Sequence, residues 1–152
     1  MLRRLAWTSV PSASFSADGL DDIVARAWRN NERHHVSGVM LFTGARFLGV
    51  LEGAEWDLAN LWRKLARDER HQDLRRIGDV LCGERWFPTW TMLRTDSAAV
   101  RAQIESLRSP QAPGPAAWAD AVHPITLRVR HPAPRPDQRL ESLRRAKARA
   151  GP

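Results

Sequence analysis

The architecture of the chain follows from one segment, Arg46-Phe47-Leu48-Gly49-Val50-Leu51-Glu52-Gly53. Its apolar residues are typical of a short buried β-strand, and Glu52-Gly53 closes that strand just before a stretch with helical spacing. Glycine weakens the middle of a strand unless a bulge forms there or another group must approach the backbone. Gly49 therefore marks either a bulge or a close approach within a central strand.

Further strands and helices are predicted on both sides of this segment. Strands are expected at residues 4–9, 36–42, 47–53, 76–82 and 89–93. Two helices are also expected: one is capped by Ser16 or Asp18 and runs to Asn30-Asn31, and the other covers residues 55–67. A short Gly-containing turn joins the strands at 36–42 and 47–53 into a hairpin. The order β-α-β-β-α-β with an added strand predicts an α+β, ferredoxin-like sheet with both helices on one face.

The C-terminal third is expected to cover the other face of the sheet. Asp96 can cap a short helix with apolar residues at Val100, Ile104 and Leu107, and residues 109–115 are a Pro-rich linker. Ile125, Leu127 and Val129 alternate, which is compatible with an edge strand. The predicted organisation is a domain at 1–95, a cap helix and linker at 96–130, and a flexible basic tail at 131–152.

Composition limits the classes of function. The 152 residues suit one domain plus an appendage, and no apolar run is long enough to span a membrane, so a cytoplasmic location is expected. The net charge is +7, but residues 128–152 hold eight basic and two acidic side chains, which leaves 16 and 15 in residues 1–127. A nucleic acid could therefore bind only through the tail. Cys82 is the only cysteine, and a buried thiol is expected there.

Four motifs, in this order, resemble the BLUF family of blue-light sensors that use FAD, in its short single-domain form. They are Arg29 to Gly38, Phe47 to Gly53, Asp68 to His71, and Phe87 to Met92. The resemblance extends over residues 1–95. It implies the ferredoxin-like fold already predicted, with the flavin held between the two helices and C-terminal helices on the opposite face.

The resemblance also implies a set of FAD-contacting residues. They are Trp7, Ser9, Asn30, Asn31, Gly49, Arg70, His71, Trp90 and Met92. Asn31 matches an asparagine that hydrogen-bonds the flavin ring, since an amide both donates and accepts. Arg33, Lys64 and Arg67 could neutralise a diphosphate.

Each of these residues also has a simpler interpretation. Asn31 alone would be a helix C-cap, Trp90 and Met92 would be core residues of a strand, and the basic residues would be surface charge. His34 and His35 are expected to be exposed, since no further ligand spacing supports a metal site.

Two positions depart from the pattern of the family. The resemblance implies a tyrosine on the first strand and a glutamine on the third, where this chain has Trp7 and Gly49, and the chain contains no tyrosine. An indole N–H only donates a hydrogen bond, and glycine has no amide that could rearrange. We expect the usual photocycle to be lost.

Trp7 and Gly49 also form a compensating pair in this interpretation. The first and third strands are neighbours in a ferredoxin-like sheet, and enlarging one side chain while removing the other roughly conserves volume. Two outcomes are open: a pocket that still holds flavin beside Trp7, or a pocket that Trp7 fills.

The predicted function is a BLUF-like, FAD-binding sensory domain whose light response is absent or altered. The alternative is a flavin-free relative that acts as a protein-interaction module. An enzyme is not expected, because the chain has no phosphate loop, no recognisable pair of catalytic carboxylates and no Ser-His or Cys-His arrangement. A downstream protein partner is expected, and a homodimer is compatible with the sequence.

Overall fold

A computed structural model describes residues 1–16, 20–110, 112–114 and 117–127. The strands are β1 (Leu2–Pro11), β2 (Ser37–Phe42), β3 (Phe47–Ala54), β4 (His71–Cys82) and β5 (Trp90–Arg94). The helices are α1 (Leu20–Arg33), α2 (Glu55–Leu65), α3 (Ala98–Ser106) and α4 (Trp118–Leu127). The predicted tail at 131–152, Val129 and the capping candidate Asp18 lie outside the described residues.

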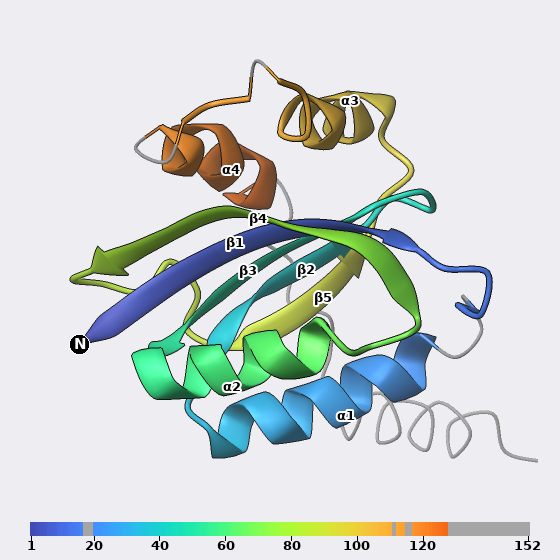
Figure 1. Cartoon of the computed structure of the whole chain (residues 1–152). Helices are drawn as coiled ribbons and strands as arrows, with labels where there is room; N and C mark the ends of the chain where they lie inside the picture. The colour runs from blue at the N-terminus through green and yellow to red at the C-terminus, as the bar shows by residue number, and fades with distance from the viewer. Residues whose placement is uncertain (17–19, 111, 115–116, 128–152) are drawn as a thin grey trace, which may run out of the picture.

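The five strands form one sheet in the order β4-β1-β3-β2-β5. All neighbours are antiparallel except β2 and β5, which run parallel. Helices α1 and α2 cover one face, which we call the cleft face, and α3 and α4 cover the other, which we call the cap face (Figure 1). The predicted α+β, ferredoxin-like fold with two helices on one face is confirmed.

Residues of β3 alternate between two cores, as a strand buried on both faces requires. Leu48 and Val50 belong to the apolar cluster under the cap, and Phe47 and Leu51 belong to the cluster under α1 and α2. The segment that begins at Arg46 is therefore the central strand of the sheet, as predicted.

The C-terminal segment differs from its prediction. Residues 118–127 form a helix and not an edge strand, because Trp118, Val122 and Ile125 recur at helical spacing and are all buried against the sheet. A Cβ atom added to Gly78 on β4 would overlap the Trp118 indole, so the missing side chain makes room for this helix. The alternation of Ile125 and Leu127 was a weaker signal than this packing.

Several element ends also differ. The first helix continues to Arg33, so Asn31 lies inside it and the C-cap interpretation is wrong; His35, with φ of 50°, follows the helix end. Ser97, and not Asp96, caps α3 by accepting a hydrogen bond from the Val100 N–H at 3.4 Å. Strand β4 begins at His71, five residues before its predicted start. Cys82 is half-buried, so the expectation of a buried thiol is wrong.

Candidate functional site

A cavity of about 580 Å³ lies on the cleft face between α1, α2 and the sheet. Its volume is in the range of small-molecule sites, which are mostly apolar with a few polar groups. The apolar part of its wall consists of Phe15, Leu20, Ile23, Ala27, Val39, Met40, Phe47, Leu51, Leu61 and Leu65. Leu20, Ile23 and Ala27, which recur at helical spacing on α1, form one side of this cavity.

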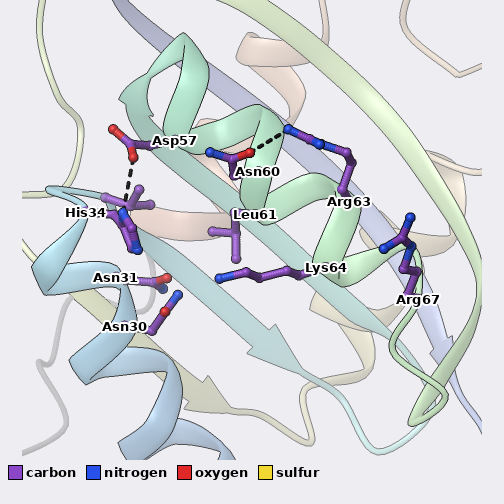
Figure 2. Close-up of a pocket in the computed structure, with 10 residues that line it drawn as sticks. Asn30, Asn31, His34, Asp57, Asn60, Leu61, Arg63, Lys64 and Arg67 are labelled. Carbon is purple, nitrogen blue, oxygen red and sulfur yellow. Dashed lines mark hydrogen bonds and ion pairs between the residues drawn. The ribbon is translucent and has the colours of Figure 1, made fainter.

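A second, more polar cavity of about 280 Å³ adjoins the first between the same two helices (Figure 2). The two cavities share Asn30, Asn31, Leu61 and Lys64. The polar cavity is also lined by His34, Val36, Asp57, Asn60, Arg63 and Arg67. Lys64 reaches from α2 toward the two asparagines of α1 (Figure 2). Together the cavities make one cleft. Its larger half is mostly apolar and has Arg26, Lys64, Asp68 and Arg70 among its lining residues. Its smaller, cationic half is lined by Arg63, Lys64, Arg67 and Asp57 with few apolar residues.

Asn31 lies where the two halves meet. Its side chain is buried, and its backbone carbonyl accepts hydrogen bonds from the N–H groups of His34 and Val36 where the helix ends. These two backbone contacts hold the residue where the two halves of the cleft meet. A buried amide offers a donor and an acceptor to any ligand that fills the space beside it.

Trp7 and Gly49 are direct partners across β1 and β3. A Cβ atom at Gly49 would overlap atoms Cε2 and Nε1 of the Trp7 indole, so the ring occupies the space of a side chain at position 49. The expectation that these residues are neighbours on adjacent strands is confirmed. Both residues line the apolar cavity, which remains open beside them. The Trp7 Nε1–H is buried and has no hydrogen-bond partner among the described residues.

His71 stands next to Trp7 at the start of β4. The two ring centroids are 5.8 Å apart, and neither nitrogen of the His71 ring has a hydrogen-bond partner within the described part of the chain. Burial lowers the pKa of His71, and the nearby Asp68 carboxylate and the backbone of Leu65 oppose this only in part. The imidazole is therefore neutral at pH 7 and offers one donor and one acceptor to the cavity.

The pKa of His71 predicts a pH dependence of folding. An unfolded histidine titrates near 6.5, so between this value and the lower pKa of the folded state the unfolded chain binds more protons. We expect the free energy of unfolding to fall as the pH drops below about 6.5. Urea unfolding at pH 7.5, 6.5 and 5.5 measures this, and His71→Asn should make the fall smaller. His35→Asn, at an exposed position, controls for the loss of an imidazole. Equal slopes for wild type and His71→Asn would contradict the assignment.

Arg70 lines the apolar cavity but is already paired. Its Nε and Nη2 atoms donate to the two Asp68 carboxylate oxygens at 2.8 and 2.5 Å. This pairing raises the pKa of Arg70 and lowers that of Asp68. The guanidinium remains about half exposed, so it forms part of the cleft rim and not of its interior.

The structure brings together most of the predicted cofactor-binding residues. Those that line the cleft are Trp7, Asn30, Asn31, Gly49, Arg70, His71 and Trp90, joined by Lys64 and Arg67. Ser9 and Met92 are buried but line neither cavity, and Arg33 is exposed and lines neither. The Ser9 hydroxyl has no hydrogen-bond partner among the described residues. His34 and His35 are exposed, as predicted.

Met40 is a wall residue that sequence reasoning missed. It pairs with Met92 across the parallel strands β2 and β5, and it is Met40, on the inner of these two strands, that lines the cavity. In the sequence it sits in an unbroken apolar run, where nothing separates a cavity wall from a packed core. The only indication of the position of Met40 is the pairing of β2 with β5, and this pairing can be predicted only when the strand order is known.

Comparisons with known proteins show which sequences and structures this chain is similar to. The sequence model described as BLUF, sensors of blue-light using FAD, matches residues 2–93. The photoactivated adenylate cyclase subunit alpha of Euglena gracilis is 31% identical over 93 residues, which is 60% of this chain and 9% of that protein. The blue light- and temperature-regulated antirepressor BluF of Escherichia coli is 33% identical over 63 residues, which is 41% of this chain and 15% of that protein.

Solved structures are also similar. The dark-state structure of BlrB, a BLUF protein, has a TM-score of 0.62 and 26% identity, and the match covers 82% of this chain and 94% of that one. The chain spans about a tenth of the length of the Euglena cyclase subunits it matches. Since the family model covers residues 2–93, the chain belongs to the BLUF family, the sensors of blue light using FAD.

Proposed function

We propose that this chain is an FAD-binding sensory domain of BLUF type in which the light response is absent or altered. The observation that carries the proposal is the cleft between α1 and α2, with an apolar half of about 580 Å³ and an adjoining cationic half. A flavin dinucleotide has the same division into an aromatic ring and a charged diphosphate. Bound FAD would supply the absorption of blue light.

The apolar half has polar groups suited to a heteroaromatic ring. Asn31, the Trp7 Nε1–H and the His71 ring are buried or half-buried, and the Trp7 and His71 nitrogens lack protein partners among the described residues. A buried polar group without a partner costs stability, so a ligand that pairs with it would be bound more tightly. Asn31 would bond the ring edge, with Trp7 and His71 beside it.

The cationic half suits the diphosphate. Lys64 and Arg67 line it, whereas the Arg63 guanidinium already donates to the Asn60 side-chain oxygen Oδ1 at 2.5 Å. Hydrogen bonds from a cation to a phosphate are about twice as strong as neutral ones. We therefore assign Lys64 and Arg67 to the diphosphate. Arg33, the third residue considered for this role from the sequence, is not included because it lines neither cavity.

Lys64→Met is expected to weaken FAD binding roughly 10- to 100-fold, the cost of a charge-assisted hydrogen bond. The matched control is Arg33→Met, which removes a cation at the end of α1 and should leave the affinity within about two-fold, as expected of exposed charge. Titration of FAD with protein, followed by flavin fluorescence, gives the dissociation constants. Equal affinities for the two variants would contradict the assignment of the cationic half.

The colour of the purified protein tests the cofactor itself. A yellow sample, or one that turns yellow and stays so through gel filtration after FAD is supplied, supports the proposal. A colourless sample would favour the alternative, a flavin-free relative that acts as a protein-interaction module. The burial of Trp7 over Gly49 is the observation in favour of that alternative, because the indole fills the space at position 49 without any ligand.

The output of this domain is part of the same proposal. The chain matches the BLUF portion of its relatives and not their cyclase portions, so we infer that it is not an enzyme and acts through a downstream protein partner, as a monomer or a homodimer. The E. coli relative is named an antirepressor, which fits such a role. A cytoplasmic location and contact with nucleic acid only through the basic tail complete the proposal. Across the part of the chain that the structure describes, no helix is long and apolar enough to cross a bilayer.

A further inference from the structure

The chain must cross the whole sheet between its last two strands. Strand β4 is at one edge and β5 at the other, so the seven residues from Gly83 to Thr89 pass the ends of β1, β3 and β2. The crossing lies at the end of the sheet where the chain begins (Figure 1). It contains no helix or strand, so its backbone groups need partners elsewhere.

Glu52, on the central strand β3, meets this crossing at its midpoint. Its side chain is fully buried on the cap face. One carboxylate oxygen accepts hydrogen bonds from the Arg4 Nε and the Trp86 N–H at 2.6 and 2.9 Å. The other accepts from the Phe87 N–H at 3.0 Å and the Ser37 hydroxyl at 3.5 Å. One carboxylate on β3 thus holds two successive amides of the crossing and also contacts Arg4 of β1 and Ser37 of β2.

Two arginines complete this attachment. Arg4 Nη2 donates to the Glu84 carbonyl at 2.7 Å, and its guanidinium lies 3.6 Å from the centre of the Trp86 ring. Arg85 donates to the Glu52 carbonyl and the Ser37 hydroxyl, both at 2.6 Å. These hydrogen bonds lie around Glu52 and do not involve the amides of Trp86 and Phe87. Both of those amides donate to the Glu52 carboxylate.

The attached segment leads directly into the cleft. Trp86 and Phe87 pack against the core of the cap face, whereas Trp90, three residues further, belongs to the core of the cleft face and lines the apolar cavity. Between them the Thr89 carbonyl accepts a hydrogen bond from the Gly38 N–H at 3.2 Å, and Gly38 pairs with Trp90 in the sheet. Only Pro88 and Thr89 lie between Phe87, whose amide N–H is bound to Glu52, and Trp90 in the cavity wall.

We propose that Glu52 is a positioning residue for the cleft: from the opposite face of the sheet, it fixes the crossing segment that brings Trp90 into the cavity wall. The same attachment reaches helix α4 of the cap face, because the Trp86 ring contacts the His123 ring with centroids 4.3 Å apart and planes tilted by 35°. Glu52 therefore sets both the wall of the cavity and one contact of the cap helices. Its role in ligand binding rests on the proposed function; its role in holding the crossing does not.

Glu52→Gln tests this role because it keeps the size of the side chain. The glutamine amide has one accepting oxygen in place of two, so the amide of Trp86 or of Phe87 loses its acceptor. The matched control is Glu55→Gln, which neutralises an exposed carboxylate paired with Arg3. Hydrogen–deuterium exchange followed by mass spectrometry compares the peptide covering residues 84–94 with peptides from β1 and β3.

In Glu52→Gln, exchange in the 84–94 peptide should rise about ten-fold or more over wild type, the effect of one lost buried hydrogen bond, with little change in β1 and β3. FAD affinity should fall by a similar factor, and Glu55→Gln should leave both unchanged. Unchanged exchange at 84–94, or an equal rise in all peptides, would overturn the proposal. If wild type binds no FAD, the proposed function fails while the exchange result still decides the role of Glu52.

A second variant covers the case in which Glu52→Gln does not fold because Arg4 is left buried without its counter-charge. The double substitution Arg4→Met and Glu52→Gln removes both charges and keeps the side-chain volumes similar. It should fold and still show the local rise in exchange at residues 84–94. A folded double variant with wild-type exchange in that peptide would equally overturn the proposal.

Discussion

The double variant Trp7→Tyr/Gly49→Gln is expected to acquire a reversible, blue-light-driven red shift of flavin absorption, which we expect the natural chain not to show. The BLUF resemblance places a tyrosine and a glutamine at these positions. A phenol hydroxyl both donates and accepts, and a glutamine amide can present either its N–H₂ or its carbonyl oxygen to the same neighbour. The natural pair, an indole that only donates and a glycine, offers neither exchange.

Both substitutions are needed for a steric reason. Because a Cβ atom at position 49 would overlap the Trp7 indole, Gly49→Gln alone must displace that ring and is expected to cost about 1–3 kcal/mol, as overpacked cores do. Trp7→Tyr alone shortens the side chain and leaves a gap over Gly49. The two changes together should therefore be less destabilising than the sum of the single changes, the sign of direct coupling.

Absorption spectra before, during and after blue illumination measure the response of the FAD-loaded proteins. The matched control is Trp7→Phe/Gly49→Gln, which has the same packing as the double variant without the hydroxyl, and it should show no reversible shift. A double variant that binds FAD but stays unresponsive would refute the explanation that these two positions abolish switching. A reversible shift in the natural chain would refute it as well.

The arrangement of the strands was predictable from local signals. The hairpin of 36–42 and 47–53 and the two amphipathic helices follow from apolar spacing and turn residues, and the ferredoxin-like order then makes β1 and β3 neighbours. That order was enough to predict the contact of Trp7 with Gly49. The open cavity beside them was not predictable, because the sequence allowed an indole that fills the pocket equally well.

The segment at 118–127 shows where local patterns fail. Alternation of Ile125, Leu127 and Val129 and helical spacing of Trp118, Val122 and Ile125 are present in the same few residues. The segment forms a helix and not a strand because the space over Gly78 accommodates the Trp118 indole. Tertiary packing of this kind overrides a short strand pattern.

The environment of Glu52 was beyond the sequence for a different reason. In the sequence, Glu52 ends a predicted strand and precedes a predicted helix, a position that does not indicate a buried side chain. Its donors come from Arg4, 48 residues earlier, and from Trp86 and Phe87, 34 and 35 residues later. Contacts at such separations depend on the strand order and on the path of an irregular crossing, neither of which has a periodic signal.

Gly38→Ala is expected to be among the most destabilising single-atom changes in the chain. Gly38 has φ of +146°, a conformation that residues with a Cβ atom rarely adopt, and a Cβ atom there would overlap the Val50 carbonyl oxygen on the neighbouring strand. Backbone strain and overpacking each cost about 1–3 kcal/mol. The sum is a large fraction of the roughly 5–15 kcal/mol by which domains are stable.

Urea unfolding followed by tryptophan fluorescence measures this loss against Gly83→Ala, where an added Cβ atom has no heavy atom within 4 Å. Gly83→Ala should change the free energy of unfolding by no more than about 0.5 kcal/mol, as is usual for surface substitutions. Gly38 donates a hydrogen bond to the Thr89 carbonyl and pairs with Trp90 in the sheet. The fraction of Gly38→Ala protein that folds should therefore also bind FAD more weakly. A loss of stability below about 1 kcal/mol would mean that β2 can shift away from Val50, and that the cavity wall is not fixed by this strand pairing.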